Sequence, residues 1–205
     1  MNPEPWHFTT WLNLFDHWQA LIAGALGFAA AIIVVRFTLK MERRKAQLEL
    51  DALRKSLAVE LRQVVPRALG AGIALRKLAR GSDQITSRMV ESYSRVPTPS
   101  VFPAAAGRIG LLGDDAMGVV IIYSLFELGR SGTMSLINSR DPNNISPDTV
   151  AASAIPFLTA CEYALSVLPK LKTGVTAHDQ HDAALMEQIK QAISKESGRS
   201  RANGI

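Results

Sequence analysis

The chain has 205 residues, 47% of them hydrophobic and 20% charged, which excludes an intrinsically disordered protein and leaves enough apolar side chains for a buried core. The formal charge of +5 is local: residues 36–80 carry 12 basic and 4 acidic side chains, whereas residues 1–35 carry two acidic side chains and no basic one. Cys161 is the only cysteine, which excludes an intrachain disulfide and a cysteine-based zinc site, and its apolar neighbours predict a buried, inert thiol.

The longest nearly uncharged run is WQALIAGALGFAAAIIVVRF, residues 18–37, and it predicts a membrane-spanning helix over residues 18–39. About 20 residues at 1.5 Å each cover the roughly 30 Å of a bilayer's hydrocarbon layer. A cleaved secretory signal is the alternative, but such a signal places basic residues before its apolar stretch and a cleavage site soon after it. Here the basic residues follow the run, so we expect a retained anchor.

The flanks of this run predict its orientation, because basic side chains stay on the cytoplasmic side of a membrane. The run is followed by Arg36, Lys40, Arg43, Arg44 and Lys45. We therefore expect residues 40–205 in the cytoplasm and residues 1–17 outside, with their tryptophans along the outer membrane interface. The same five basic residues are expected to contact anionic lipid headgroups, although fixing the topology alone would also explain them.

Small side chains recur every four residues within the run, at Ala23, Gly27 and Ala31, and lie on one face of the predicted helix. Such a face lets two helices approach closely in lipid, and it predicts self-association as a homodimer. The alternative is that Ala and Gly are simply frequent in membrane spans.

Residues 40–80 predict a long basic helix, because they are rich in strong helix formers. An apolar stripe at spacings of three and four residues predicts a packing partner, either the later helices of this chain or a second copy in a coiled coil. Small Ala residues in the stripe favour the first. Pro66 predicts a kink or a short break near Val65. Basic residues from Arg54 to Arg80 exceed what topology needs and could contact anionic lipid or an acidic partner.

Residues 81–113 hold three prolines and predict a linker or ordered loop, with a short helical pattern near residues 85–93. The loop ends in GRIGLLGDD, which predicts a turn and a helix N-cap at Asp114 rather than a phosphate-binding loop.

Residues 114–195 predict the helices that complete the bundle. The first is a central, buried helix to about residue 129, followed by a weaker helical stretch. The next opens at Ser146 and Pro147 and ends near Pro169. Its apolar part, residues 149–168, would also fit a second membrane span, but the charge pattern around it favours a buried soluble helix. An amphipathic helix over 177–195 and a frayed tail over 196–205 complete the chain.

The most chemically suggestive cluster is HDQHDAA, which brings together His178, Asp179, His181 and Asp182 at a predicted helix start. These residue types could begin a metal site. However, acidic residues favour helix N-termini in any case, and the remaining histidines lie on the other side of the predicted span. We therefore expect no bound metal, no cofactor and no catalytic residue.

Two segments, FDHWQALIAGALGFAAAIIVV and VFPAAAGRIGLLGDDAMGVVIIYSLFEL, resemble uncharacterised small single-pass membrane proteins of bacteria. In that class a Trp-Gln-x-Leu-Ile-Ala-Gly span precedes a helical cytoplasmic domain. The resemblance implies a bacterial inner membrane and brings no activity.

The sequence thus predicts an all-α protein with a single N-terminal transmembrane helix, a long basic helix and a cytoplasmic helical bundle. The expected function is that of a membrane-anchored interaction or scaffold module. Its expected partners are anionic lipid headgroups, a second copy and an unidentified protein, and not nucleic acid. The alternatives are a membrane-anchored metal-dependent enzyme that uses the HDQHD cluster and a membrane-active stress or phage-type effector.

Overall fold

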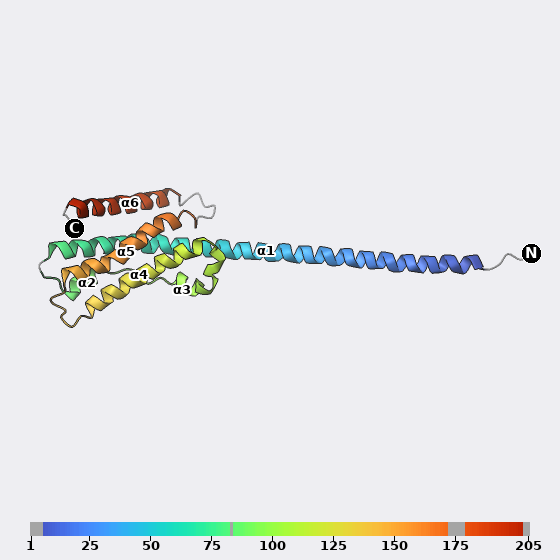
Figure 1. Ribbon diagram of the computed structural model, residues 1–205, viewed down its shortest axis with the longest axis horizontal. Coiled ribbons are helices and arrows are strands. Elements are labelled where there is room, and N and C mark those ends of the chain that lie inside the picture. Colours follow the sequence, from blue (N-terminus) through green and yellow to red (C-terminus); the bar gives the residue numbers. More distant parts are fainter. Residues whose placement is uncertain (1–5, 83, 172–178, 203–205) are drawn as a thin grey trace, which may run out of the picture. The chain divides into compact units, whose positions relative to one another are not determined.

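The chain is helical throughout the computed structural model, which describes residues 6–82, 84–171 and 179–202 (Figure 1). In chain order the elements are α1 (Trp6–Gly81), α2 (Ser87–Tyr93), α3 (Val101–Ala105), the 3₁₀ helix η1 (Ala106–Leu112), α4 (Asp115–Ile137), α5 (Pro147–Val167) and α6 (Asp179–Ala202). The described residues contain no strand, and an isolated antiparallel bridge joins Ile85 and Ile145. The predicted all-α class is confirmed.

Contacts divide the chain into a first unit, Met1–Glu49, and a second unit, Leu50–Ile205. Helix α1 belongs to both. It begins at Trp6, inside the expected external segment 1–17, and continues across residue 39 and through Pro66. Proline removes one helical hydrogen bond, but the turn around it is held by packing, since Val65 is fully buried. The short break considered near this position is therefore absent.

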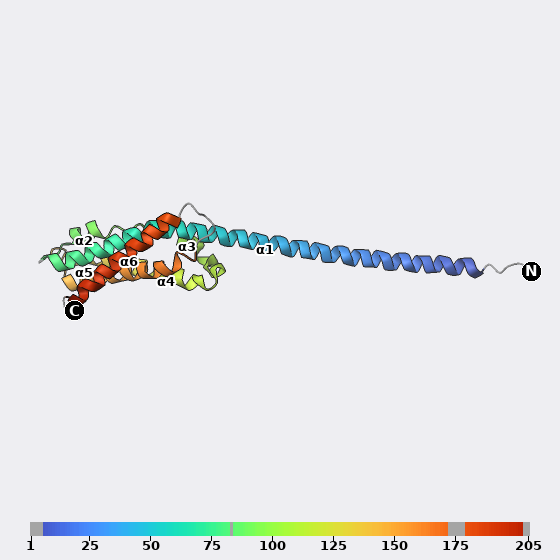
Figure 2. The same cartoon turned by 90° about the horizontal axis from the view of Figure 1, so that it is seen from above.

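The second unit is built on the apolar stripe of α1. The stripe residues from position 53 onward are buried: Leu53, Leu57, Leu61, Val64, Ala68, Ala71, Leu75 and Leu78. Most of them share one hydrophobic core with Phe126 of α4, Phe157 of α5 and Ile189 of α6, and Figures 1 and 2 show α4 and α5 alongside this part of α1. The stripe is thus buried within the chain, which is the alternative that the sequence favoured. A coiled coil of two copies would need these same residues to be exposed.

A glycine of α4 lies at the contact with α5. A Cβ atom added to Gly129 would lie 2.8 Å from Cε1 of the Phe157 ring, which is closer than real Cβ atoms approach. Because Phe157 is fully buried, its ring cannot move aside. Three residues further along α4, a Cβ added to Gly132 would meet Ser153 Cβ at an ordinary 3.6 Å. Only the first of these two glycines is required by packing.

Helix α4 differs in two ways from the expectation. It runs without interruption to Ile137, so the weaker stretch expected after residue 129 belongs to the same helix. The expectation of a central, buried helix holds for one face, which packs on the core. On the other face Met117, Val120 and Leu128 are exposed. The sequence misled because apolar side chains occur all round this helix.

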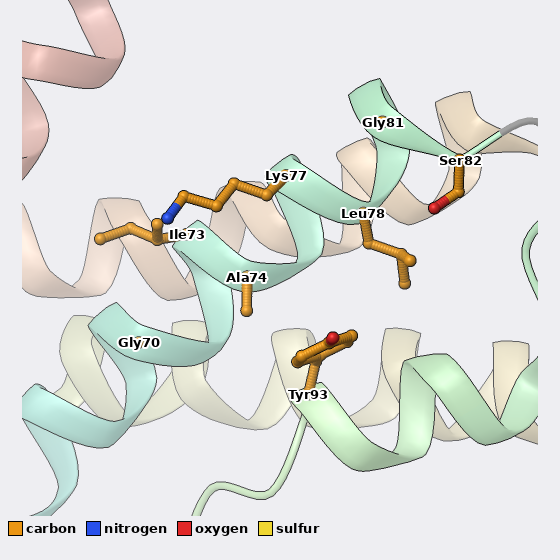
Figure 3. Close-up of a pocket in the computed structure, with 8 residues that line it drawn as sticks. All are labelled: Gly70, Ile73, Ala74, Lys77, Leu78, Gly81, Ser82 and Tyr93. Atoms are coloured by element: carbon orange, nitrogen blue, oxygen red, sulfur yellow. The ribbon is translucent and has the colours of Figure 1, made fainter.

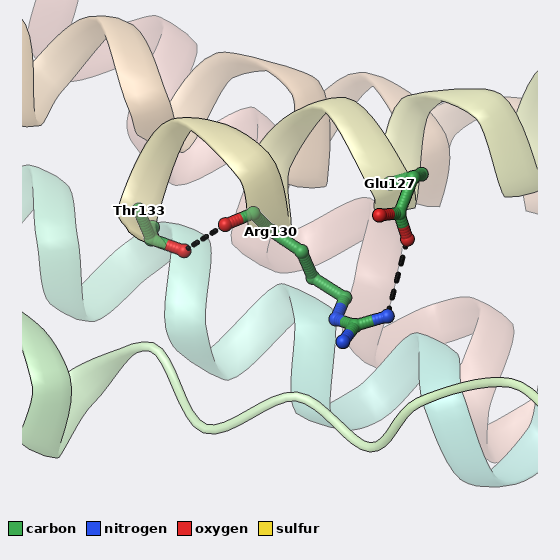
Figure 4. A network of polar contacts seen from close by, with 3 residues as sticks. All are labelled: Glu127, Arg130 and Thr133. Carbon is green, nitrogen blue, oxygen red and sulfur yellow. Dashed lines mark hydrogen bonds and ion pairs between the residues drawn. The ribbon is translucent and has the colours of Figure 1, made fainter. Parts of the chain in front are cut away.

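The C-terminal half of α4 carries a small polar network (Figure 4). Arg130 Nη1 and Glu127 Oε2 form an ion pair at 3.1 Å across one helical turn. The hydroxyl of Thr133 donates to the carbonyl of Arg130 at 2.9 Å, which satisfies a polar side chain that is buried. The network is local to one helix, so we assign it a structural role.

The expected loop 81–113 contains three short helical elements. Thr86 caps α2, as its hydroxyl accepts a hydrogen bond from the backbone N–H of Met89 at 3.4 Å. After η1, Gly113 has a φ angle of 61°, and this left-handed conformation makes the predicted turn. Asp114 occupies the N-cap position of α4 as expected, but its side chain makes no capping hydrogen bond.

The last two helices follow the predicted positions. Helix α5 has Ser146 at its N-cap and Pro147 at its start, and half of its most apolar window is buried in the second unit. Helix α6 buries Leu185 and Ile189 and extends to Ala202, beyond the expected start of the tail at residue 196.

Candidate functional site

The first unit presents an apolar helix surface that nothing in the described chain covers. Between Leu21 and Leu39 every side chain is exposed, including Leu26 at 66% and Phe28 at 71%. The segment has the length and composition of a membrane span, and so does α5, but none of the α1 window is buried whereas half of the α5 window is. Apolar surface of this extent on a water-soluble chain normally marks an interaction site. This run is therefore the first part of the candidate site.

The basic residues that follow the run gather on one side of α1. At about 100° per residue, Lys40, Arg43 and Arg44 lie about 40°, 20° and 80° around the helix from Arg36. These four residues, named here the basic face, line a shallow groove together with Leu39 and Gln47. Lys45 does not line it and lies about 180° from Arg36. Of the five basic residues singled out by sequence, the helix brings four together and separates the fifth.

The small residues singled out by sequence lie on the opposite side of the same helix. Ala23, Gly27 and Ala31, named here the small-residue face, point about 140° to 220° away from Arg36. All three are exposed, and a Cβ added to Gly27 would meet nothing within 4 Å. The two candidate surfaces therefore do not compete for space.

The second unit contains a buried carboxylate that the sequence analysis missed. Glu60 of α1 is only 7% exposed. Its Oε1 accepts hydrogen bonds from the backbone N–H groups of Ser100 at 2.5 Å and Val101 at 2.7 Å, and its Oε2 accepts from the N–H of Phe102 at 3.1 Å and the hydroxyl of Tyr123 at 2.7 Å. The carboxylate thus joins α1, the start of α3 and α4. Glu60 lies three residues after Leu57 and four before Val64, which places it beside the apolar stripe. This spacing was a signal that its side chain is buried.

The titration of this pair follows from its geometry. Burial raises the pKa of Glu60, but the hydrogen bonds from Val101, Tyr123, Ser100 and Phe102 outweigh it, so the pKa lies below its ordinary value of 4.5. Burial, with the hydrogen bond to Glu60 and its negative charge, raises the pKa of Tyr123 far above its usual range. The phenol stays protonated and the carboxylate ionised at neutral pH. No oxygen of this pair is left to act as a base, so the cluster holds the fold.

Some of the basic residues beyond position 50 are used within the second unit. Arg54 Nη2 lies 3.9 Å from Asp115 Oδ2, and Lys170 Nζ lies 3.7 Å from Asp115 Oδ1. Asp115 thus connects α1, the start of α4 and the chain after α5. Arg62, Arg76 and Arg80 also have interaction partners. Arg54, one of the residues that could have contacted lipid or an acidic partner, is instead engaged within the unit.

A pocket of about 470 Å³ lies between the end of α1 and Tyr93 of α2 (Figure 3). Ile73, Ala74 and Leu78 form apolar walls, and the ring of Tyr93 faces Ala74 and Leu78 from the other side. Among the described lining residues, Lys77 carries a charged group and Tyr93 a phenol. These residues include no set of metal-ligating atoms, so we assign the pocket no chemical role.

The HDQHD cluster lies largely outside the part of the chain whose side chains are described. His178 is outside the described residues, and Asp179, His181 and Asp182 are placed only as the first turns of α6. Among the residues that the structure describes, no group of three His, Cys, Asp or Glu side chains could hold a metal ion. The metal site stays a prediction from the sequence.

Cys161 of α5 is fully buried, as its neighbours predicted. Its thiol donates a weak hydrogen bond to the carbonyl of Val65 at 3.6 Å, beside Pro66. Burial, and to a smaller extent the charge of Glu162, raises the pKa of the thiol to about 12. A protonated thiol without solvent access is unreactive, so this residue is part of the core.

Comparisons with protein-family models, with curated proteins and with solved structures find no match for this chain.

Proposed function

We propose that this protein is a membrane-anchored interaction or scaffold module of a bacterial inner membrane. The first unit spans the bilayer once, with residues 1–17 outside. The helical second unit lies in the cytoplasm, where the anchor raises its concentration near the membrane and near other copies. The orientation rests on the excess of basic residues after the span.

One observation carries the proposal. From Leu21 onward the apolar run of α1 is completely exposed within the chain, and cationic side chains begin at its end. A soluble helix with that surface would have to hide it against a partner, whereas a bilayer covers all sides of it at once. With the helix centred on Phe28, about 30 Å of hydrocarbon extends from Trp18 to Thr38. This range agrees with the span over residues 18–39 that the sequence predicts.

The membrane test uses two leucines that are equally exposed in the structure, Leu26 at 66% and Leu48 at 62%. Arginine near the centre of a span costs about 3 kcal/mol of insertion free energy, and arginine beyond the membrane costs almost nothing. We expect Leu26→Arg to shift the protein from the alkali-resistant membrane fraction to the soluble fraction and Leu48→Arg to behave as the unaltered chain. Equal behaviour of the two variants, or release of the unaltered chain by alkali, contradicts the proposal.

Self-association through the small-residue face is the second part of the proposal. The exposed, unobstructed Gly27 and its position opposite the basic face support it. Ala31→Leu places a bulky side chain on this face, whereas Ala29→Leu places the same side chain about 160° away. Energy transfer between labelled copies in vesicles should be lost with Ala31→Leu and kept with Ala29→Leu. Loss with both variants or with neither rejects this face as the contact surface.

A protein partner of the second unit completes the proposal, and the exposed apolar side chains of α4 support it. A pull-down from solubilised membranes with Leu128→Glu and with Ser166→Glu, which alters an exposed residue of α5, tests this part. A protein retained by the unaltered chain and by Ser166→Glu but lost with Leu128→Glu is the expected result. Identical capture by all three forms places the contact elsewhere.

A further inference from the structure

The residues of the basic face are confined to one side of α1, which membrane topology does not require. Topology depends on the number of basic residues near the end of a span and is indifferent to the side of the helix on which they lie. Yet Arg36, Lys40, Arg43 and Arg44 occupy an arc about 100° wide. All four side chains are exposed and border one continuous groove with Gln47.

The acidic residues of this segment reinforce the asymmetry. Between positions 36 and 49 the only acidic side chains are Glu42 and Glu49. Both lie within about 60° of Lys45, on the side opposite the groove. The groove side therefore carries four positive charges and no negative one, and the other side carries one positive and two negative charges. Such a separation creates a directed positive potential on one side of the helix.

The depth of the basic face matches the headgroup layer. A bilayer adds roughly 5–7 Å of polar layer to each side of its hydrocarbon. With α1 centred on Phe28, Lys40 and Arg43 lie about 18 Å and 22 Å from the midplane, which is within or at the edge of that layer. Arg36 lies deeper, and its long side chain can extend along the helix to the same layer. The amide of Gln47 adds a further hydrogen-bond donor at the outer end of the groove.

We propose that the basic face is a binding site for the phosphate group of an anionic phospholipid in the cytoplasmic leaflet. Guanidinium and ammonium groups on one arc converge on phosphate oxygens, and Arg matches a phosphate with two parallel hydrogen bonds. This inference rests on the proposed membrane anchoring and adds to it a defined side of contact. Because the small-residue face points the other way, two associated copies would bind lipid on their outer sides, away from each other.

A lipid is favoured over nucleic acid as the source of the phosphate. The groove follows the apolar run without an intervening residue, so a bound phosphate shares the position of a headgroup. The segment from 40 to 49 also has no aromatic side chain on which a base could stack. Binding of nucleic acid is retained as an outcome of the test.

The experiment compares Lys40→Gln with Lys45→Gln in the full chain. Each variant removes one positive charge by the same substitution, one on the basic face and one opposite it. The proteins are reconstituted in phosphatidylcholine vesicles that contain phosphatidylglycerol, and spin-labelled forms of both lipids report their relative contact with the protein. We expect the preference for phosphatidylglycerol to fall about fivefold with Lys40→Gln and less than twofold with Lys45→Gln.

Three results would overturn the inference. An equal loss of the phosphatidylglycerol preference with both variants means that the net charge attracts the lipid, whichever side of the helix carries it. An unchanged preference with Lys40→Gln means that the groove does not hold the lipid. Stronger binding of a short DNA duplex than of anionic vesicles by the detergent-solubilised chain, lost with Lys40→Gln, assigns the groove to nucleic acid. Insertion is measured separately by alkaline extraction, so failure of the anchor is distinguished from failure of the lipid site.

Discussion

Replacing Glu60 tests how the second unit is held together. In Glu60→Gln one carboxylate oxygen becomes an NH₂ group, which faces at least one backbone N–H of the Ser100–Phe102 segment and cannot accept its hydrogen bond. The negative charge that strengthens the remaining bonds is also lost. Hydrogen bonds to a charged group contribute about 1.5–3 kcal/mol each, and an unsatisfied buried donor costs about 1–3 kcal/mol. We therefore expect Glu60→Gln to lower the free energy of unfolding by about 2–4 kcal/mol at pH 7.

The pH dependence gives the same prediction a second readout. Because the pKa of folded Glu60 lies below its ordinary 4.5, the ionised carboxylate stabilises the fold above that pH, and this contribution is lost as the pH falls through the lowered pKa. Urea unfolding of the full chain in detergent, followed by circular dichroism, should show the difference between the unaltered chain and Glu60→Gln narrowing below about pH 4.5. Tyr123→Phe, which keeps the ring stacked on Phe102 at 4.1 Å, should lower the free energy of unfolding less than Glu60→Gln does at pH 7. A difference under about 0.5 kcal/mol at pH 7, or one that does not change with pH, would refute the reasoning.

Two further predictions concern the packing of the second unit. Alanine at either Gly129 or Gly132 gains up to about 1 kcal/mol of helix propensity, but Gly129→Ala forces a methyl group against the buried ring of Phe157, at a cost of about 1–3 kcal/mol. Thermal unfolding should therefore show a lower midpoint temperature for Gly129→Ala than for Gly132→Ala. Equal midpoint temperatures would mean that α4 and α5 move apart freely to accommodate the methyl group. Cys161, with a pKa of about 12, should resist a thiol reagent at pH 8 and react fully once the protein is unfolded. Rapid labelling of the folded chain would place the thiol at the surface.

The sequence predicted those features of the fold that depend on short, regular patterns. The stripe from Leu53 to Leu78 is buried as its spacing required, and the chemistry of Ser146 and Pro147 marks the start of α5. These features depend on residues within a few turns of each other, so their spacing is sufficient. Helix α4 could not be predicted in the same way, because apolar residues all round a helix do not indicate which face is covered.

The Glu60 cluster shows why part of the structure was missed. Its partners are mainly backbone N–H groups of residues 100–102, which are 40 to 42 residues away in sequence. Every residue except proline carries a backbone N–H group, so no side-chain pattern predicts which of them bind Glu60. The two faces of the first unit, in contrast, were available from spacing alone. The position of Lys45 opposite the other four basic residues follows from the same spacing once α1 is continuous through this segment.

The orientation of the chain in the membrane tests the account most directly. A reporter fluorescent only in the cytoplasm and a reporter enzyme active only outside are fused in turn after Ile205 and before Met1. The account predicts a fluorescent C-terminal fusion and an active enzyme at the N-terminus, because the five basic residues from Arg36 to Lys45 hold the second unit inside. An active enzyme at the C-terminus, or a fluorescent reporter at both ends, would contradict the single outward-to-inward span on which the proposed function rests.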